Sequence, residues 1–368
     1  MTASTTGSTN GQKLQVRSLR KTFGEFVALA GADLDLADGE FLTLLGPSGS
    51  GKTTLLLAIA GLNEPDDGEI RIDGNLATYL PPFKRDIGMV FQNYALFPHM
   101  TIAGNVAFAL KMRRWPRARV TEAVRKVLEI VQLPHLADRY PRQLSGGQQQ
   151  RIALARAMVY EPSVILMDEP LGALDKKLRD QLQLEIKRLH RELGIAVLYV
   201  THDQEEALVM SDRICLMRDG HIEQVGTPDD LYFRPRTVFA ADFLGEANLL
   251  SARVAGRDGG AMLVDLDAGQ RVRGVSDHAL SEGQPVRVMV RPETVRLLAE
   301  GEDAENVIEA RYTDVVMSGS TTQTYFVTEN GLQLVVKALT AGPIGGGRGD
   351  GTVRLGWSAE RCVVLPAA

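Results

Sequence analysis

One octapeptide decides the fold of this chain: Gly46-Pro47-Ser48-Gly49-Ser50-Gly51-Lys52-Thr53. It matches G-x-x-x-x-G-K-[ST], and it lies between an apolar run at 41–45 and a helical run that starts at Thr54, the setting this pattern requires. The glycines let backbone N–H groups wrap phosphates, Lys52 places its charge by the β- and γ-phosphates, and the Thr53 hydroxyl can ligate Mg²⁺. Residues 46–54 therefore predict a site for ATP and Mg²⁺ in an α/β domain.

A second apolar run, at 164–167, ends in Asp168-Glu169. Asp168 would hold Mg²⁺ together with Thr53 and solvent, while Glu169 would act as general base or orient the attacking water. Taken alone, an acidic pair at a strand end is more often a solvated edge. Beside the phosphate loop, the pair predicts ATP hydrolysis.

The pattern of residues changes about two thirds of the way along the chain. Apolar strand runs alternate with long helical patterns up to residue 240, as in an α/β domain, and short alternating strands with glycine-rich turns follow. We expect a disordered tail at 1–12, an α/β domain at 13–240 and an all-β domain at 241–368. One helical face carries Leu178, Leu182, Ile186, Leu189 and Leu193 and should pack in the core. In the second domain, Asn330-Gly331 predicts a hairpin turn, because both residues tolerate positive φ.

The overall composition excludes several classes of protein. The chain has 368 residues and a net charge of −5, with Lys and Arg spread along it, so no footprint for nucleic acid stands out. Its two cysteines, Cys215 and Cys362, lie in apolar runs and are expected to be buried free thiols, which fits a reducing cytoplasm. No apolar run reaches the ~18 residues of a membrane helix. A membrane role would therefore run through partner proteins.

A third motif lies between the first two: Leu144-Ser145-Gly146-Gly147-Gln148-Gln149-Gln150-Arg151. It opens a helical pattern, so the free N–H groups and the helix dipole would favour an anion at Ser145, Gly146, Gly147 and Gln148. As a bare pattern, Ser-Gly-Gly is most often only an N-cap with a flexible turn. The neighbouring motifs favour a second contact with nucleotide.

In this order, the three motifs resemble those of the ATP-binding subunits of ABC transporters. The resemblance implies a phosphate-loop ABC ATPase domain with a helical subdomain at about 93–160. It also implies that Gln92 senses and ligates Mg²⁺, that His202 senses the γ-phosphate, and that Asp175, at the end of Leu171-Gly172-Ala173-Leu174-Asp175, lies in a dimer loop. Phe23 matches the aromatic residue that stacks on adenine, although a core phenylalanine is equally ordinary.

The same resemblance implies that the working unit is a homodimer. The family binds ATP between two head-to-tail copies, so Ser145 and Gly147 would contact nucleotide held by residues 46–53 of the other copy. Closing a second face over the γ-phosphate would add positioned charge and exclude water.

The chain downstream of His202 resembles importer ATPases of the maltose and spermidine/putrescine type, with Asp203-Gln204-Glu205-Glu206-Ala207 and an OB-like TOBE domain around Val290-Arg291-Pro292-Glu293. Residues 80–99 and 243–248 look most like polyamine importers; iron, sulfate, phosphonate or sugar are the alternative cargoes. The resemblance implies two permeases, a periplasmic substrate-binding protein, and a location on the cytoplasmic face of the bacterial inner membrane. Residues 94–100 would form part of a permease groove or only pack the helical subdomain.

Two departures from the family pattern stand out. Gly172 replaces a serine that is common in the dimer loop, and Gly104 replaces a common glutamate near the permease groove. The first removes a possible hydroxyl contact and leaves the phosphate-loop chemistry untouched.

Two alternative functions compete with this one, and the sequence argues against both. A soluble ABC protein could use the same site to clamp nucleic acid, since OB folds can bind it, but the chain has one cassette and no basic linker. A phosphate-loop GTPase would lack the motif at 144–151.

Overall fold

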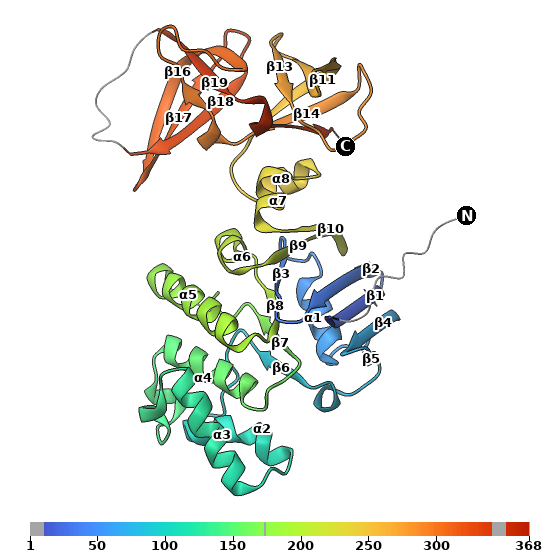
Figure 1. Cartoon of the computed structure of the whole chain (residues 1–368), viewed down its shortest axis with the longest axis vertical. Coiled ribbons are helices and arrows are strands. Elements are labelled where there is room, and N and C mark those ends of the chain that lie inside the picture. Colours follow the sequence, from blue (N-terminus) through green and yellow to red (C-terminus); the bar gives the residue numbers. More distant parts are fainter. Residues whose placement is uncertain (1–10, 173, 341–350, 368) are drawn as a thin grey trace. The chain divides into compact units, whose positions relative to one another are not determined.

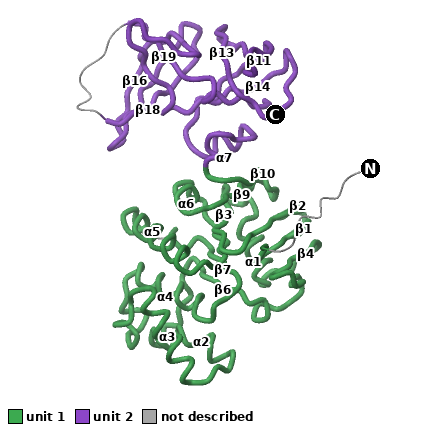
Figure 2. Tube along the Cα trace, viewed as in Figure 1, with its two compact units in different colours: residues 1–228 green, residues 229–368 purple. Residues whose placement is uncertain are grey.

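The computed structural model describes residues 11–172, 174–340 and 351–367, and divides the chain into units at 1–228 and 229–368 (Figures 1 and 2). This boundary precedes the one expected at 240/241, because α7 (Pro228–Phe233), apart from its first residue, and α8 (Val238–Phe243) group with the second unit. Most of the tail expected at 1–12 lies outside the described residues, and Gln12 already begins a strand.

A six-stranded sheet forms the centre of the first unit, in the order β10-β9-β3-β8-β7-β6 (Figure 1). All neighbours pair in parallel except β9 and β10. The carboxyl ends of β3, β7 and β8 therefore lie along one edge, where α/β sheets bind ligands. The strands are β3 (Phe41–Leu45), β6 (Ile87–Val90), β7 (Val164–Asp168), β8 (Ala196–Val200), β9 (Arg213–Arg218) and β10 (His221–Gly226).

Alternate residues of the buried strands pack into two cores. Val164 and Leu166 of β7 join α1 (Lys52–Ala60) and a four-stranded antiparallel sheet, whereas Ile165 and Met167 join α2 to α5. Burial on both faces explains why these strands read as continuous apolar runs. The antiparallel sheet has the order β2-β1-β4-β5 and consists of β1 (Gln12–Phe23), β2 (Phe26–Ala37), β4 (Asp67–Ile72) and β5 (Asn75–Leu76).

The helices on the second face begin at side-chain caps where the sequence offers them. Asp175 caps α5, its Oδ1 accepting from Leu178 N at 3.0 Å, and Gly194 ends this helix in the left-handed conformation. The expected face of α5 is buried at Leu182, Ile186 and Leu189. The helices are α2 (Ile102–Met112), α3 (Arg117–Ile130), α4 (Gly146–Met158), α5 (Lys176–Leu193) and α6 (Gln204–Met210).

The second unit contains two five-stranded antiparallel sheets, as expected for an all-β domain. Their shared core includes Trp357, Val288 and Phe326. Strands of the sheet β13-β12-β11-β14-β20 are β11 (Asn248–Asp258), β12 (Ala261–Leu266), β13 (Arg271–Gly274), β14 (Pro285–Val290) and β20 (Cys362–Pro366). Those of the sheet β15-β19-β16-β17-β18 are β15 (Arg296–Leu297), β16 (Asn306–Ser318), β17 (Thr321–Val327), β18 (Gln333–Leu339) and β19 (Thr352–Trp357).

The structure contains the predicted buried cysteines and the predicted hairpin. Cys215 and Cys362 are buried free thiols, as predicted. The hairpin joining β17 and β18 is present, but Val327 pairs with Gln333 and, of the two turn residues, only Gly331 has a positive φ, 80°. The turn closes with Gly331 N donating to Thr328 O at 3.0 Å, so the connection is longer than a two-residue turn.

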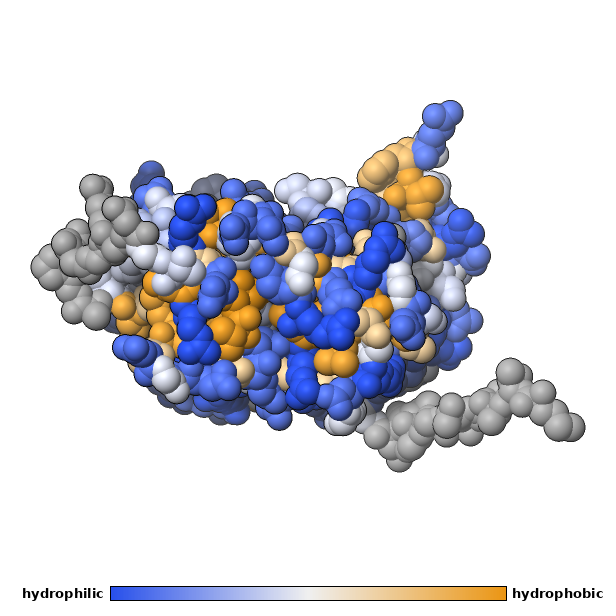
Figure 3. Space-filling model, turned by 90° about the horizontal axis from the view of Figure 1, so that it is seen from above, coloured by the Kyte–Doolittle hydropathy of each residue, from blue (hydrophilic) through white to orange (hydrophobic). Residues whose placement is uncertain are grey.

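The surface mixes polar and apolar side chains. Figure 3 shows apolar patches among hydrophilic residues on one face. In the second unit, the large apolar side chains of Leu297, Met317 and Leu339 are more than half exposed. Exposed apolar residues of this kind are ordinary on folded proteins and do not by themselves mark a site.

A buried arginine explains why α7 and α8 belong to the second unit. Arg291, 2% exposed, donates from Nη1 to the carbonyl oxygens of Ala241, Gly245 and Glu246, each at 3.0 Å. Its Nη2 donates to Tyr232 O at 3.0 Å, and the guanidinium lies 4.2 Å from the centre of the Tyr232 ring. The planar fork of arginine can satisfy this many acceptors at once, which a lysine ammonium cannot.

Arg291→Lys is expected to lower the free energy of unfolding of the second unit by about 2–4 kcal/mol, because buried carbonyls lose their donors. Denaturant unfolding followed by Trp357 fluorescence, in a Trp115→Phe background, would report on this unit alone. The matched control is Arg287→Lys, on the adjoining strand β14, where the arginine is only part-buried and bonds one side chain, Ser251. Equal losses in the two variants would contradict the anchoring role.

Candidate functional site

The phosphate loop owes its path to glycines. Gly46, Gly49 and Gly51 have φ of 154°, 82° and 99°, values that favour glycine. A Cβ on Gly46 would lie 2.2 Å from Met217 O, and one on Gly51 would lie 2.4 Å from Ala28 O. The helix that follows, α1, has no side-chain cap and no acidic residue in its first turn. Its first N–H groups are therefore open to an anion.

Lys52 lies inside this loop. Its Nζ donates to Gly46 O and Pro47 O, both at 2.8 Å, and the residue is only 5% exposed. Burial lowers the pKa of Lys52, and the carboxylates of Glu169 and Asp168 oppose that shift. The loop thus surrounds the ammonium group of Lys52, which the carboxylates of Asp168 and Glu169 attract.

The acidic pair meets three other predicted site residues at the edge of the sheet. Thr53 Oγ1 donates to Asp168 Oδ1 at 3.3 Å, His202 Nδ1 lies 3.2 Å from Glu169 Oε1, and Gln92 Nε2 lies 3.5 Å from Glu169 Oε2. Burial raises the pKa of Asp168, while the hydrogen bond from Thr53 lowers it. One cluster therefore contains residues from four separate stretches of the chain.

The backbone at Glu169 is itself unusual. Its φ of 43° is left-handed, which a glutamate rarely adopts, and its N–H donates to Val200 O at 3.0 Å. This bond joins the residue after β7 to the last residue of β8, Val200, which lies two residues before His202. The conformation aims the Glu169 carboxylate at His202 and Gln92.

The motif at 144–151 is a complete helix cap. Ser145 Oγ accepts from Gln148 N at 3.4 Å, and Gln148 Oε1 accepts from Ser145 N at 3.0 Å, the two halves of a capping box. Gly147 is buried, and a Cβ there would lie 3.1 Å from Leu178. Among the described residues, no hydrogen bond joins 145–148 to the phosphate loop. Within one copy, the local cap is the contact made by Ser145.

The remaining predicted residues lie around this cluster. Phe23 ends β1 and is 51% exposed, so it is not a core phenylalanine; Lys21 Nζ lies 5.5 Å from its ring centre. Asp175 caps α5, and Ala173, two residues before it, lies outside the described residues. A Cβ on Gly172 would meet no described atom closer than 3.6 Å, so a side chain larger than glycine has space to begin there.

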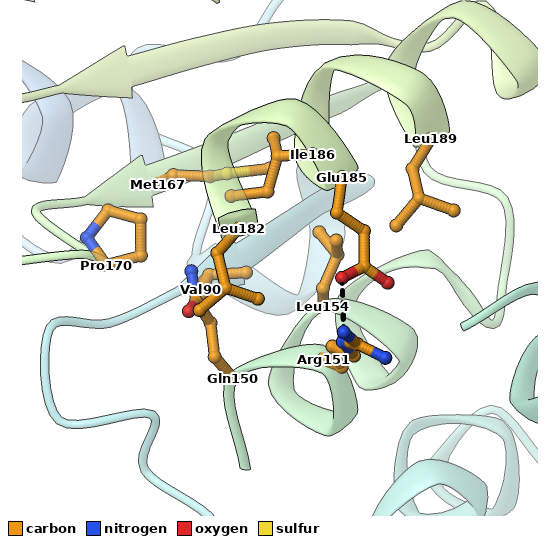
Figure 4. Close-up of a pocket in the computed structure, with 10 residues that line it drawn as sticks. All are labelled: Val90, Gln150, Arg151, Leu154, Met167, Pro170, Leu182, Glu185, Ile186 and Leu189. Carbon is orange, nitrogen blue, oxygen red and sulfur yellow. Dashed lines mark ion pairs between the residues drawn. The ribbon is translucent and has the colours of Figure 1, made fainter. Parts of the chain in front are cut away.

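A pocket that the sequence analysis did not predict lies where α4 and α5 meet (Figure 4). Arg151 Nη2 and Glu185 Oε2 form an ion pair at 2.7 Å, and neither polar atom of the buried Gln150 amide has a hydrogen-bond partner among the described residues. The pocket is otherwise apolar, and its other lining residues are Val90, Leu154, Met167, Pro170, Leu182, Ile186 and Leu189. Side chains of α4 and α5 line the pocket, and none of the predicted phosphate-loop residues does.

Comparisons with known proteins show the family of this chain. Residues 29–172 match the family model described as ABC transporter, and residues 288–365 match the TOBE domain. The spermidine/putrescine import ATP-binding protein PotA of Rubrobacter xylanophilus is 43% identical, over 96% of this chain and 93% of that protein. The chain belongs to the ABC transporter ATP-binding proteins. A PotA of Thermobifida fusca is 47% identical over 92% of this chain and 88% of its own length.

Solved structures of ABC cassettes match the first part of the fold. CbiO1 of Clostridium perfringens, part of the ABC transporter complex CbiONQ, has a TM-score of 0.56 and 28% identity, covering 60% of this chain and 91% of its own. The dimeric bacterial ABC transporter cassette MJ0796 has a TM-score of 0.52 and 35% identity, covering 58% and 98%.

These matches define the biochemical class. This ABC protein binds and hydrolyses ATP as the ATPase subunit of an importer. It acts with membrane partners, and none of its described helices is long and apolar enough to cross a bilayer.

Proposed function

We propose that this chain drives the import of spermidine and putrescine. Support comes from relatives named for that cargo, which match 88% or more of this chain at 43–47% identity. The observation that carries the ATPase role is the cluster of Lys52, Thr53, Asp168, Glu169 and His202 at one edge of the sheet, joined by the contacts described above.

ATP would bind with its phosphates on residues 46–54 and its adenine against Phe23. Lys52 would exchange its bonds to Gly46 O and Pro47 O for phosphate oxygens. The half-exposed ring of Phe23 offers a stacking face.

Residues beside the loop fit a magnesium ion. Thr53 and Asp168 place their oxygens 3.3 Å apart, and Gln92, whose Nε2 lies 3.5 Å from the neighbouring Glu169, would offer its amide oxygen as a further ligand. Hard oxygen donors next to nucleotide phosphates are what Mg²⁺ requires, and it commonly takes few protein ligands. When bound, the ion neutralises charge on the β- and γ-phosphates.

Glu169 is proposed to take a proton from the attacking water. His202 and Gln92 hold its carboxylate from two sides, at 3.2 Å and 3.5 Å. His202 would also reach toward the γ-phosphate, and Gln92 would link the site to the segment at 94–100. A positioned base with a fixed orientation is the requirement for this step.

The proposed working unit is a homodimer. Ser145–Gln148 and Asp175 bond locally in one copy, and Ser145, the N-cap residue of α4, is exposed and so accessible to a partner. Ser145, Gly146, Gly147 and Gln148 would contact ATP on the other copy's phosphate loop. The dimeric state of the matching cassette MJ0796 supports this arrangement.

Two permeases and a periplasmic substrate-binding protein are proposed as partners, at the cytoplasmic face of the inner membrane. The segment at 94–100 supports a permease contact because Asn105 holds it from inside: Oδ1 accepts from Phe97 N at 2.7 Å, and Nδ2 donates to Phe97 O and Met100 O. A loop fixed in this way presents a defined surface.

Uptake of labelled spermidine and putrescine tests the cargo. A strain lacking this gene should lose most polyamine uptake, wild type should restore it, and Glu169→Gln should not. Iron, sulfate, phosphonate and maltose uptake should stay unchanged. Normal polyamine uptake in the deletion strain, together with loss of another cargo, would overturn the assignment while leaving the ATPase role in place.

A further inference from the structure

Arg179, on the first turn of α5, joins two segments on either side of the catalytic cluster. Its Nη1 donates to Asp203 Oδ2 at 2.9 Å, and its Nη2 donates to Leu174 O at 3.1 Å. Leu174 directly precedes Asp175, and Asp203 directly follows His202. One side chain therefore connects the segment proposed to face the other copy with the proposed γ-phosphate sensor.

Beneath this arginine lies a buried carboxylate. Glu206 is 2% exposed, and its Oε2 accepts from Tyr199 Oη at 2.8 Å and from Thr201 Oγ1 at 2.7 Å. Its Oε1 lies 3.8 Å from Arg179 Nε, for which the described part of the chain offers no hydrogen-bond partner. Burial raises the pKa of Glu206. A buried charge of this kind is costly unless a cation compensates it, and Arg179 is the cation in contact.

The same network holds the backbone on both sides of His202. Thr201 Oγ1 bonds Glu206 and also accepts from Asp203 N at 3.0 Å, while Asp203 caps α6 through Oδ1. The His202 side chain itself is 57% exposed and has its Nδ1 3.2 Å from Glu169. The backbone of His202 is therefore held through its two neighbours, Thr201 by Glu206 and Asp203 by Arg179, while its side chain contacts Glu169.

We propose that Arg179 is a positioning residue that couples the Leu174–Asp175 segment to His202, so that closure of one copy against the other sets the sensor at the ATP site. The proposal rests on the proposed roles of Asp175 and His202. Arg179 does not contact the nucleotide; it acts through the Asp203 carboxylate and Leu174 carbonyl, two acceptors that an arginine fork can hold together and a lysine cannot.

Arg179→Lys tests this idea because it keeps the charge and removes the fork. We expect kcat for ATP hydrolysis to fall roughly ten- to hundred-fold, as for a misplacement of about 1 Å in a catalytic group. The Kd for ATP should stay within about two-fold, because no phosphate or adenine contact is lost. The control is Arg188→Lys on the same helix, which pairs with Glu192 and should leave kcat unchanged.

A double-mutant cycle separates positioning from a general structural effect. In a His202→Ala background, Arg179→Lys should have no further effect on kcat, since the two act through one element. Asp203→Asn keeps a capping residue, breaks the ion pair, and should lower kcat in the same direction even if Arg179→Lys folds poorly. An unchanged kcat in Arg179→Lys, or losses that add in the His202→Ala background, would overturn the proposal. Wild type without ATPase activity would instead contradict the proposed function.

Discussion

Replacing Glu169 with glutamine is expected to lower the rate of ATP hydrolysis by at least about a hundred-fold, the usual contribution of a positioned general base. Glutamine keeps the size of the side chain and can still bond His202 and Gln92, which lie 3.2 Å and 3.5 Å from the carboxylate. ATP affinity should therefore stay close to that of wild type. Single-turnover hydrolysis and equilibrium ATP binding would measure the two quantities separately.

The same variant should accumulate as an ATP-bound dimer, because closure no longer ends in hydrolysis. Size-exclusion chromatography with ATP would detect it, and adding Ser145→Arg should abolish the dimer, since Ser145 is proposed to face the partner's nucleotide. Glu129→Gln, which changes an exposed glutamate paired with Arg125 on α3, is the matched control. Wild-type turnover in Glu169→Gln would remove this residue from the base role.

Lys52→Ala is expected to weaken ATP binding by about ten- to a hundred-fold, equivalent to losing a charge-assisted hydrogen bond of about 1.5–3 kcal/mol. The buried ammonium now bonds Gly46 O and Pro47 O at 2.8 Å, and in the complex it would bond phosphate oxygens. Without it, the loop loses both its internal tie and its charge. Isothermal titration with a non-hydrolysable ATP analogue would measure the change.

Thermal unfolding with and without nucleotide distinguishes lost binding from lost folding. A ligand that binds only the folded state raises its stability with concentration, so wild type should gain stability from ATP and Lys52→Ala should gain little. Lys13→Ala is the control for removing a part-buried lysine, because Lys13 pairs with Asp73 and Asp38 and is not part of the predicted site. Equal ATP affinities in wild type and Lys52→Ala would contradict the proposal that Lys52 binds the phosphates.

Contiguous features were predictable from the sequence. The phosphate loop, the strands at 41–45 and 164–168 and the helix with Leu182, Ile186 and Leu189 each depend on neighbouring residues, because glycine, apolar periodicity and capping act over a few positions. The Asn330-Gly331 pair likewise predicted the position of the hairpin. It did not predict the length of the turn, which follows from the pairing of Val327 with Gln333.

Sheet order is what brought the candidate site together. β8 lies between β3 and β7 in the sheet. Thr53, Asp168, Glu169 and His202 therefore meet, although Thr53 and His202 are 149 positions apart in the sequence. Sequence motifs identified these residues, but a motif of a few neighbouring residues does not predict the distances between residues far apart in the sequence. Resemblance supplied their expected roles, and those roles stay predictions until the variants above are measured.

The sequence by itself determined the class of chemistry, because backbone wrapping around phosphate requires glycines and a lysine at fixed spacing. Only the tertiary structure decided where its buried cations would bond. Arg85, 4% exposed, donates to Ala58 O, Ile59 O and Thr78 O, and Arg291, 2% exposed, donates to the carbonyl oxygens of Tyr232, Ala241, Gly245 and Glu246 on other segments of the chain. In a sequence these arginines look like surface residues. Folding buries them because backbone carbonyls, which every residue carries, become their partners.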